Sequence, residues 1–278
     1  MCYTSLIFAI NNNHVGELGL KILVNQIDEN YENNNDGYAL FFTNYKNIKE
    51  KIRTLHFNEF IKFIKKHEDK IKQSKLIHLH LRKSTNFVSQ EFIHLWEVNN
   101  YNCSHNGILF NTFNNNIKND SLSFFMQYSN ILNNLNKLKN VLQNNLVGYG
   151  LFLLSNNNKF EIIAFSLNKN TCINVFNDNL VTICSNDFNV KNNISFNVKK
   201  HEKEKFLNFY LDEYEQINFN FTKSKIYKKL NTTESNFILY YNLEKNIYKT
   251  IKLNIKNNSY NFDRRDNDNY RLWRWYKC

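Results

Sequence analysis

Short apolar segments alternate along the chain with longer segments whose apolar residues recur at the spacing of a helix. The short segments are rich in β-branched and aromatic residues, which indicates buried strands. The expected strands are Tyr3–Ile10, Tyr38–Thr43, Leu76–Arg82, Cys103–Phe110, Gly148–Leu154, Phe160–Phe165, Cys172–Phe176, Leu180–Cys184, Gln216–Phe221, Asn236–Leu243 and Ile247–Ile255. The expected helices are Val15–Tyr31, Ile48–Ile71, Asp120–Gln143 and Lys199–Tyr214.

The order of these elements predicts a single α+β domain over residues 1–278. The Asn-rich segments between the elements are short and mark loops, and no linker rich in Pro, Ser or Gly divides the chain. With 278 residues, of which 42% are hydrophobic, the chain is long enough to bury a large core. Residues 186–278 are expected either to complete this domain or to cap it.

The basic charge of the chain has a compositional explanation. Thirty-six lysines and arginines against 25 acidic residues give a net charge of +11, a value compatible with a nucleic-acid partner. Asn, Lys, Ile, Phe and Tyr dominate the composition, however, and Pro is absent, as an A/T-rich genome would produce. Because the lysines are spread through the sequence, we do not expect nucleic-acid binding.

The apolar segments and the cysteines indicate a cytoplasmic protein. No segment approaches the roughly 20 apolar residues of a membrane helix, and Tyr3–Ile10 lacks the flanking residues of a signal peptide. The cysteines are Cys2, Cys103, Cys172, Cys184 and Cys278. Their odd number, wide spacing and lack of a CxxC pair argue against a disulfide framework and against a finger-type zinc site. We expect no membrane association, no metal and no cofactor.

Cys2 directly follows Met1, as in proteins with a processed amino-terminal nucleophile. Cysteine is small enough for Met1 to be removed, which would leave a thiol and a free α-amine on one residue. Such an amine has an unperturbed pKa of roughly 7.7–8.0, so near neutral pH it can accept the thiol proton. A penultimate cysteine alone more often just begins a first strand, so other motifs must decide the interpretation.

Three further segments support Cys2 as a nucleophile. They are Asp36-Gly37-Tyr38-Ala39, His80-Leu81-Arg82-Lys83-Ser84-Thr85, and His105-Asn106-Gly107 with Asp120 after it. In this order and at these separations, they resemble class II glutamine amidotransferases of the stand-alone kind over residues 2–185. The resemblance implies a four-layer αββα sandwich of the N-terminal-nucleophile hydrolase type. It also implies an enzyme that cleaves the side-chain amide of glutamine and releases ammonia.

The resemblance assigns the catalytic roles to three residues. Cys2 would attack the amide carbon and form a γ-glutamyl thioester, and its own α-amine would pass the proton to the departing ammonia. The side-chain amide of Asn106 and the backbone N–H of Gly107 would form the oxyanion hole. Taken alone, an Asn-Gly pair is most often a turn.

Four other residues are implied to bind the substrate. Arg82 would hold the α-carboxylate of glutamine through a bidentate fork. Asp120 would bind the α-ammonium group, and Thr85 and His80 would line the same site. Each residue also has a plain structural interpretation: Arg82 could end a strand in an ordinary salt bridge, and Asp120 could cap the helix that follows it.

The segment after Thr85 departs from the family pattern. The family has Gly after this Thr and an Asn-x-His-Pro-Phe-like segment soon after it. This chain has Asn86-Phe87 and then Phe92-Ile93-His94-Leu95-Trp96. Because Phe92 replaces Asn in a loop that lines the glutamine site, the physiological substrate stays open. A γ-glutamyl peptide or a small-thiol conjugate is an alternative with the same chemistry. For released ammonia, the implied partner is a synthase subunit.

Two alternatives come from other classes of protein. On strands, His78 and His80 would point to one face, and so would Cys103 and His105. If these two strands were neighbours, the four side chains could form a tetrahedral zinc site. The tail beginning at Arg264-Arg265 and ending in Arg271-Leu272-Trp273-Arg274-Trp275-Tyr276 interleaves cations with aromatic residues, as single-strand nucleic-acid binders do. We favour an edge strand for this tail. A non-catalytic binding protein on the same fold is the remaining alternative.

Overall fold

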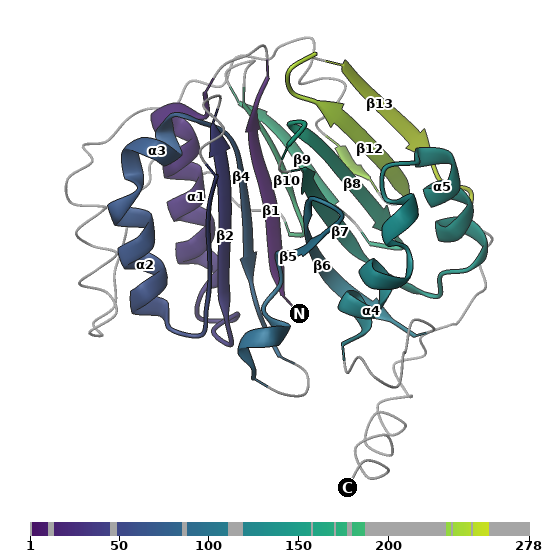
Figure 1. Ribbon diagram of the computed structural model, residues 1–278, viewed down its shortest axis with the longest axis horizontal. Helices are drawn as coiled ribbons and strands as arrows, with labels where there is room; N and C mark the ends of the chain where they lie inside the picture. The colour runs from purple at the N-terminus through teal and green to yellow at the C-terminus, as the bar shows by residue number, and fades with distance from the viewer. Residues whose placement is uncertain are drawn as a thin grey trace, which may run out of the picture.

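The computed structural model describes residues 2–10, 14–44, 49–84, 88–110, 119–156, 158–169, 171–176, 180–186, 232–234, 236–245 and 247–255. Two antiparallel sheets lie face to face, with helices on the outer face of each (Figure 1). The expected four-layer αββα sandwich is therefore confirmed. Within the described residues, no helix combines the length and the apolar character needed to cross a membrane.

The larger sheet has the first strand of the chain at its centre. Its described strands, in spatial order, are β11 (Thr232–Glu234), β9 (Thr171–Phe176), β10 (Leu180–Cys184), β1 (Tyr3–Ala9), β4 (Ser74–Leu81), β2 (Tyr38–Asn44) and β3 (Lys49–Thr54). Every residue of β1 and β4 is buried. A strand covered on both faces has no solvent-facing positions, which explains why these two segments are so continuously apolar.

The smaller sheet contains the strand with the His105-Asn106-Gly107 motif. Its described strands, in spatial order, are β13 (Ile247–Lys252), β12 (Phe237–Asn242), β8 (Glu161–Leu167), β7 (Gly148–Asn156), β6 (Tyr101–Leu109) and β5 (Trp96–Val98). Strands β12 and β13 lie beyond residue 185, so the C-terminal part of the chain contributes directly to this sheet.

Helices cover the outer face of each sheet. Helices α1 (Gly16–Asn30), α2 (Phe57–Lys66) and α3 (Glu68–Lys72) lie on the larger sheet, and α4 (Asp120–Gln127) and α5 (Leu135–Asn144) lie on the smaller one (Figure 1). Two short 3₁₀ helices, Gln90–Phe92 and Ser129–Ile131, lie in the connections. A separate cluster of apolar side chains is buried between each pair of neighbouring layers. One cluster lies under each helical layer and one lies between the sheets.

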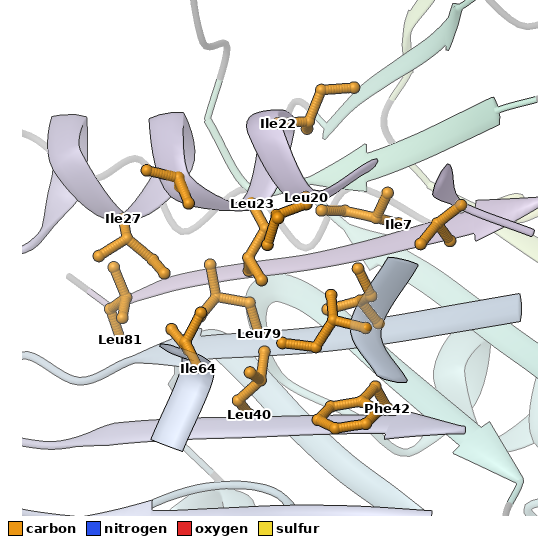
Figure 2. Close-up of a cluster of buried hydrophobic side chains, with 14 of the residues drawn as sticks. Ile7, Leu20, Ile22, Leu23, Ile27, Leu40, Phe42, Ile64, Leu79 and Leu81 are labelled. Atoms are coloured by element: carbon orange, nitrogen blue, oxygen red, sulfur yellow. The ribbon is translucent and has the colours of Figure 1, made fainter. Parts of the chain in front are cut away.

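In the cluster under α1 and α2, side chains spaced as in a helix pack on side chains spaced as in a strand. Leu20, Leu23 and Ile27 of α1 point toward Leu79 of β4 and Leu40 of β2 (Figure 2). The helix presents residues three or four positions apart, whereas the strands present every second residue. This matched burial fixes α1 on the sheet.

Two expected helices were wrong in part. The first part of Ile48–Ile71 is the edge strand β3, which pairs with β2, and the helices begin only at Phe57. Charged residues are common on edge strands because they discourage pairing with other chains, so the lysines of β3 resembled a helix surface. Strands β5 and β11 were not predicted either, because each has only three residues.

The expected helix Asp120–Gln143 is in fact two helices, α4 and α5, separated by a 3₁₀ turn. Asn134 is the N-cap of α5, and its side chain accepts a hydrogen bond from the Lys137 N–H. Asparagine competes with helical hydrogen bonds in this way, which favours a new helix start. The expected helix Lys199–Tyr214 and the expected strand Gln216–Phe221 lie outside the described residues.

We predict that Leu79→Ala lowers the free energy of unfolding by about 2–5 kcal/mol, because it leaves a cavity in the cluster under α1. Leu79 is completely buried. The matched control is Val88→Ala, at a side chain that is 57% exposed, where we expect a change below about 0.5 kcal/mol. Urea unfolding of both variants measures the difference, and equal losses of stability would contradict this packing.

Candidate active site

A hydrogen-bonded contact joins the two sheets near the start of β1. The hydroxyl oxygens of Thr4 in β1 and Ser104 in β6 lie 2.6 Å apart, and Nε2 of His78 lies 2.7 Å from the same Ser104 oxygen. Because side chains alternate along a strand, Cys2 and Asn106 lie on the same facing surfaces, each two residues from this contact. Away from it, apolar side chains fill the space between the sheets.

Cys2 directly precedes β1 and is partly exposed. Its Sγ accepts a hydrogen bond from the Lys83 N–H at 3.4 Å and lies 3.5 Å from the Lys83 carbonyl oxygen. Burial raises the pKa of the thiol, while the Lys83 N–H and the charges of Arg82 and Lys169 act in the opposite direction. Burial dominates, so the thiol is protonated at neutral pH and needs a base before it can act as a nucleophile.

Arg82 follows β4 and lies beside Cys2. Its backbone N–H donates to the Gly37 carbonyl at 2.8 Å, and its carbonyl accepts from the Asp36 N–H at 3.0 Å. The Asp36 carboxylate accepts the Ser84 N–H at 2.8 Å, and Nη2 of Arg82 donates to the Ser84 hydroxyl at 3.1 Å. The Asp36-Gly37 motif therefore holds the chain that presents Arg82 to Cys2.

The side-chain amide of Asn106 is buried, and the described residues offer it no hydrogen-bond partner. Asn106 has no exposed surface, and neither Oδ1 nor Nδ2 makes a hydrogen bond within the described residues. Leaving such a group unsatisfied costs about 1–3 kcal/mol. Such a group normally binds another protein group, an ordered water or a ligand.

Gly107 is required by the packing of β6 against β7. It pairs with Gly150, and a Cβ at position 107 would overlap the Tyr149 carbonyl oxygen and approach the Cα of Gly150 to 2.5 Å. In an oxyanion hole, a glycine leaves room for the substrate to approach the backbone closely. The structure gives a second reason, which is the close contact between the two strands.

Lys169 also belongs to the candidate site, although the sequence did not predict it. It lies just after β8, and its Nζ donates to the Asn106 carbonyl oxygen at 3.2 Å. Burial lowers the pKa of Lys169 to about 8, and a charge on the Cys2 sulfur would act to raise it. Lys169 therefore contacts Asn106 and interacts electrostatically with Cys2. No sequence pattern distinguishes it from the other lysines.

A stack of histidines supports the strand that carries Asn106. The rings of His80 and His94 lie face to face with centroids 3.8 Å apart, and His94 also contacts Trp96. Nδ1 of His94 accepts the backbone N–H of His105 at 3.2 Å. His94, noted in the sequence only as part of an altered loop, thus links the His80 motif to the His105 motif. His80 stays a candidate substrate ligand, since neither of its ring nitrogens makes a hydrogen bond within the described residues.

Asp120 organises the end of β6 and the start of α4. Its carboxylate accepts the backbone N–H groups of Leu109 and Ser121, both at 2.8 Å. The Ser121 hydroxyl in turn contacts Nδ1 of His105 at 2.7 Å. The N-cap of α4 is Asn119, so the plain interpretation of Asp120 as the cap was wrong by one residue. Thr85 lies outside the described residues.

The proposed zinc site is wrong. His78 points between the sheets, where it contacts Ser104 and Ser155. Cys103 and the ring of His105 lie on the other face of the smaller sheet, among the apolar residues under α4 and α5. Within the described residues, no three His, Cys, Asp or Glu side chains are grouped to bind a metal. The tail that begins at Arg264 lies outside the described residues.

Comparisons with known proteins support the fold. No family model and no curated protein matches the sequence. Among solved structures, this chain is similar to a glutamine phosphoribosylpyrophosphate amidotransferase from B. subtilis, with a TM-score of 0.54 and 14% identity. It is also similar to an allosteric regulatory enzyme of purine biosynthesis, with a TM-score of 0.56 and 13% identity. Each match covers 92% of this chain and 50% of the other.

A third match, to a glutamine aminotransferase class-II domain protein from Silicibacter pomeroyi, has a TM-score of 0.42 and 8% identity. It covers 91% of this chain and 99% of that chain, and the fold assignment does not depend on it. The resemblance to class II glutamine amidotransferases, with their N-terminal-nucleophile hydrolase sandwich, is thus confirmed at the level of the fold. The chain spans about half the length of the first two structures.

We predict that buried histidines make stability depend on pH. Burial lowers the pKa of His78 to about 3 and that of His105 to about 4, and it depresses the pKa values of His80 and His94 strongly. Histidines in the unfolded chain have a pKa of about 6.5. Below that pH, the unfolded chain therefore binds more protons than the folded chain. The free energy of unfolding should therefore fall as the pH decreases from about 6.5 toward the folded-state values.

Urea unfolding between about pH 7.5 and about pH 4.5 measures this dependence. One fully shifted histidine contributes a slope of up to about 1.4 kcal/mol per pH unit. His78→Gln should reduce the slope, whereas the control His14→Gln, at an exposed position, should leave it unchanged. Identical slopes for wild type and His78→Gln would show that this histidine is not neutral in the folded protein.

Proposed function

We propose that this protein hydrolyses the side-chain amide of glutamine through a γ-glutamyl thioester on Cys2 and releases ammonia. The observation that carries the proposal is the buried side-chain amide of Asn106, which makes no hydrogen bond within the described residues. The backbone carbonyl of the same residue accepts a hydrogen bond from Lys169, whose charge interacts with Cys2. An amide donor kept free in this way is suited to an oxyanion that exists only during the reaction. The similarity of fold to glutamine amidotransferases adds independent support.

The first step requires the removal of Met1. The freed α-amine of Cys2, with an ordinary pKa of roughly 7.7–8.0, takes the thiol proton that burial otherwise retains. The sulfur then attacks the amide carbon, and a carbon–sulfur bond forms as the carbonyl becomes an oxyanion. When the carbon–nitrogen bond breaks, the α-amine returns the proton to the leaving nitrogen, which departs as ammonia. Water then hydrolyses the thioester and gives glutamate.

The negative charge on the oxygen is stabilised by two donors. These are Nδ2 of Asn106 and the backbone N–H of Gly107, neighbours at the end of β6. Loss of one such donor typically lowers kcat by about 10²–10³. Because the fold already fixes their position, neither donor has to be ordered during the reaction.

The free amino acid is held by charged groups around Cys2. Arg82, positioned by Asp36-Gly37 beside Cys2, binds the α-carboxylate of glutamine. Asp120 binds the α-ammonium group, and Thr85 and His80 complete the site. We also infer a cytosolic setting, in which the scattered cysteines stay reduced, and a synthase partner that accepts the ammonia.

The test of this proposal is the intact mass of the purified protein after treatment with 6-diazo-5-oxo-norleucine, an electrophilic glutamine analogue. We expect loss of Met1 and one covalent label on Cys2. Cys2→Ala should take no label and hydrolyse no glutamine. The control Cys172→Ala, at a buried position under the helices of the larger sheet, should be labelled and active. A wild-type chain that retains Met1 and takes no label would rule the proposal out.

A second prediction separates binding from catalysis. Asn106→Ala removes an oxyanion donor, so kcat for glutamine should fall by about 10²–10³ with little change in KM. Arg82→Lys replaces the bidentate fork with a point charge, so KM should rise by about tenfold or more while kcat changes less. Steady-state kinetics measure both variants. The opposite pattern, a KM effect at Asn106 and a pure kcat effect at Arg82, would contradict these roles.

The same assays compare substrates. The leaving group does not alter the thioester chemistry, so γ-glutamyl peptides and small-thiol conjugates are assayed beside glutamine. The substrate with the highest kcat/KM identifies the physiological class. Failure of all of them in a chain with a processed Cys2 would favour a non-catalytic binding role.

A further inference from the structure

The turn after β8 carries a lysine into the space between the sheets. Strand β8 belongs to the smaller sheet and β9 to the larger one, so the connection between them crosses from one sheet to the other. Hydrogen bonds hold its described part: the Asn168 N–H donates to the Asn236 side chain at 2.7 Å, and the Ser166 hydroxyl donates to the Lys169 carbonyl at 2.5 Å. Asn168 has a φ of 47°, in the left-handed region that asparagine tolerates. The backbone of Lys169 is therefore fixed.

Within the part of the chain that the structure describes, the ammonium group of Lys169 forms no ion pair. Its Nζ donates to the Asn106 carbonyl oxygen. Burial lowers its pKa to about 8, and a negative charge on the Cys2 sulfur would act in the opposite direction. Lys169 is partly buried, and a cation withdrawn from water is normally paired, so its position favours negative charge that develops on the Cys2 sulfur.

The contact with Asn106 also affects the next residue. The Asn106 carbonyl and the Gly107 N–H belong to the same peptide unit. A cationic donor on the carbonyl oxygen draws electron density from that unit and strengthens the N–H as a donor. Lys169 thus acts on the proposed oxyanion hole without touching the substrate.

We propose that Lys169 is a positioning residue, whose ammonium group orients and polarises the Asn106–Gly107 peptide and stabilises negative charge on the Cys2 sulfur. The first part rests on the proposed function; the second concerns the thiol alone. Lys169 lies outside the segments that carry the resemblance.

The experiment measures alkylation of Cys2 by iodoacetamide against pH, without substrate, in wild type, Lys169→Met and Lys169→Arg. The Cys2 peptide is followed by mass spectrometry. Loss of the positive charge should raise the thiol pKa, so the alkylation midpoint of Lys169→Met should move to higher pH. A midpoint that lies one pH unit higher slows alkylation near neutral pH by about tenfold. Lys169→Arg should stay close to wild type.

The matched control is Lys159→Met, which removes an exposed lysine from the turn at the opposite end of β8. It should alkylate like wild type. Circular dichroism and the urea midpoint verify that each variant is folded. An unchanged alkylation midpoint in folded Lys169→Met overturns the proposal.

Turnover provides the second measurement. In Lys169→Met, kcat for glutamine should fall by about tenfold with KM nearly unchanged. In wild type, kcat should decline on the alkaline side as Lys169 loses its proton, starting near its pKa of about 8. Lys169→Arg should move this decline to higher pH, because a guanidinium stays protonated.

The two proposals fail in different ways. A wild type that hydrolyses neither glutamine nor a γ-glutamyl substrate refutes the proposed function, and alkylation alone then decides the role of Lys169. A wild type that hydrolyses glutamine, together with a Lys169→Met variant of equal kcat and equal alkylation midpoint, refutes only the positioning role.

Discussion

The hydrogen bond between Thr4 and Ser104 is the constraint on which the candidate site depends, because it joins the two sheets directly. Ser104 also contacts His78, and all three side chains are completely buried. A buried polar network with its hydrogen bonds satisfied specifies one arrangement of its strands. Since Cys2 and Asn106 each lie two residues from this network, it fixes the proposed nucleophile relative to the proposed oxyanion donor.

Sequence and structure reveal different parts of the site. Cys2, Arg82 and Asn106 were identified from motifs whose residue types suit the chemistry, and the structure brings them to one end of the inter-sheet space. Lys169 could not be found in this way. It is one of 36 cationic residues, and its importance comes from a crossing between sheets that only the tertiary structure defines. His94 was visible in the sequence, but its contacts with two other motifs were not.

The fold was predictable where burial is extreme. Strands β1 and β4 are covered on both faces, so their sequences are continuously apolar and β-prone, and both strands were predicted within about two residues, the ordinary uncertainty of element ends. Helix α1 was equally clear from its apolar spacing. The predictions were wrong at the periphery, where packing is one-sided. Strand β3 is rich in charge, and a 3₁₀ turn and the N-cap Asn134 separate α4 from α5.

The edges of the two sheets explain part of the basic character of the chain. In the described structure the larger sheet ends at β3 and β11, and the smaller one at β5 and β13. Strands β5 and β11 have three residues each, too few to template another chain. The longer edges carry charged side chains, Lys49, Glu50, Lys51 and Arg53 on β3 and Lys249 and Lys252 on β13. Charged side chains on an edge strand hinder its pairing with another chain, so these residues restrain self-association through open strands.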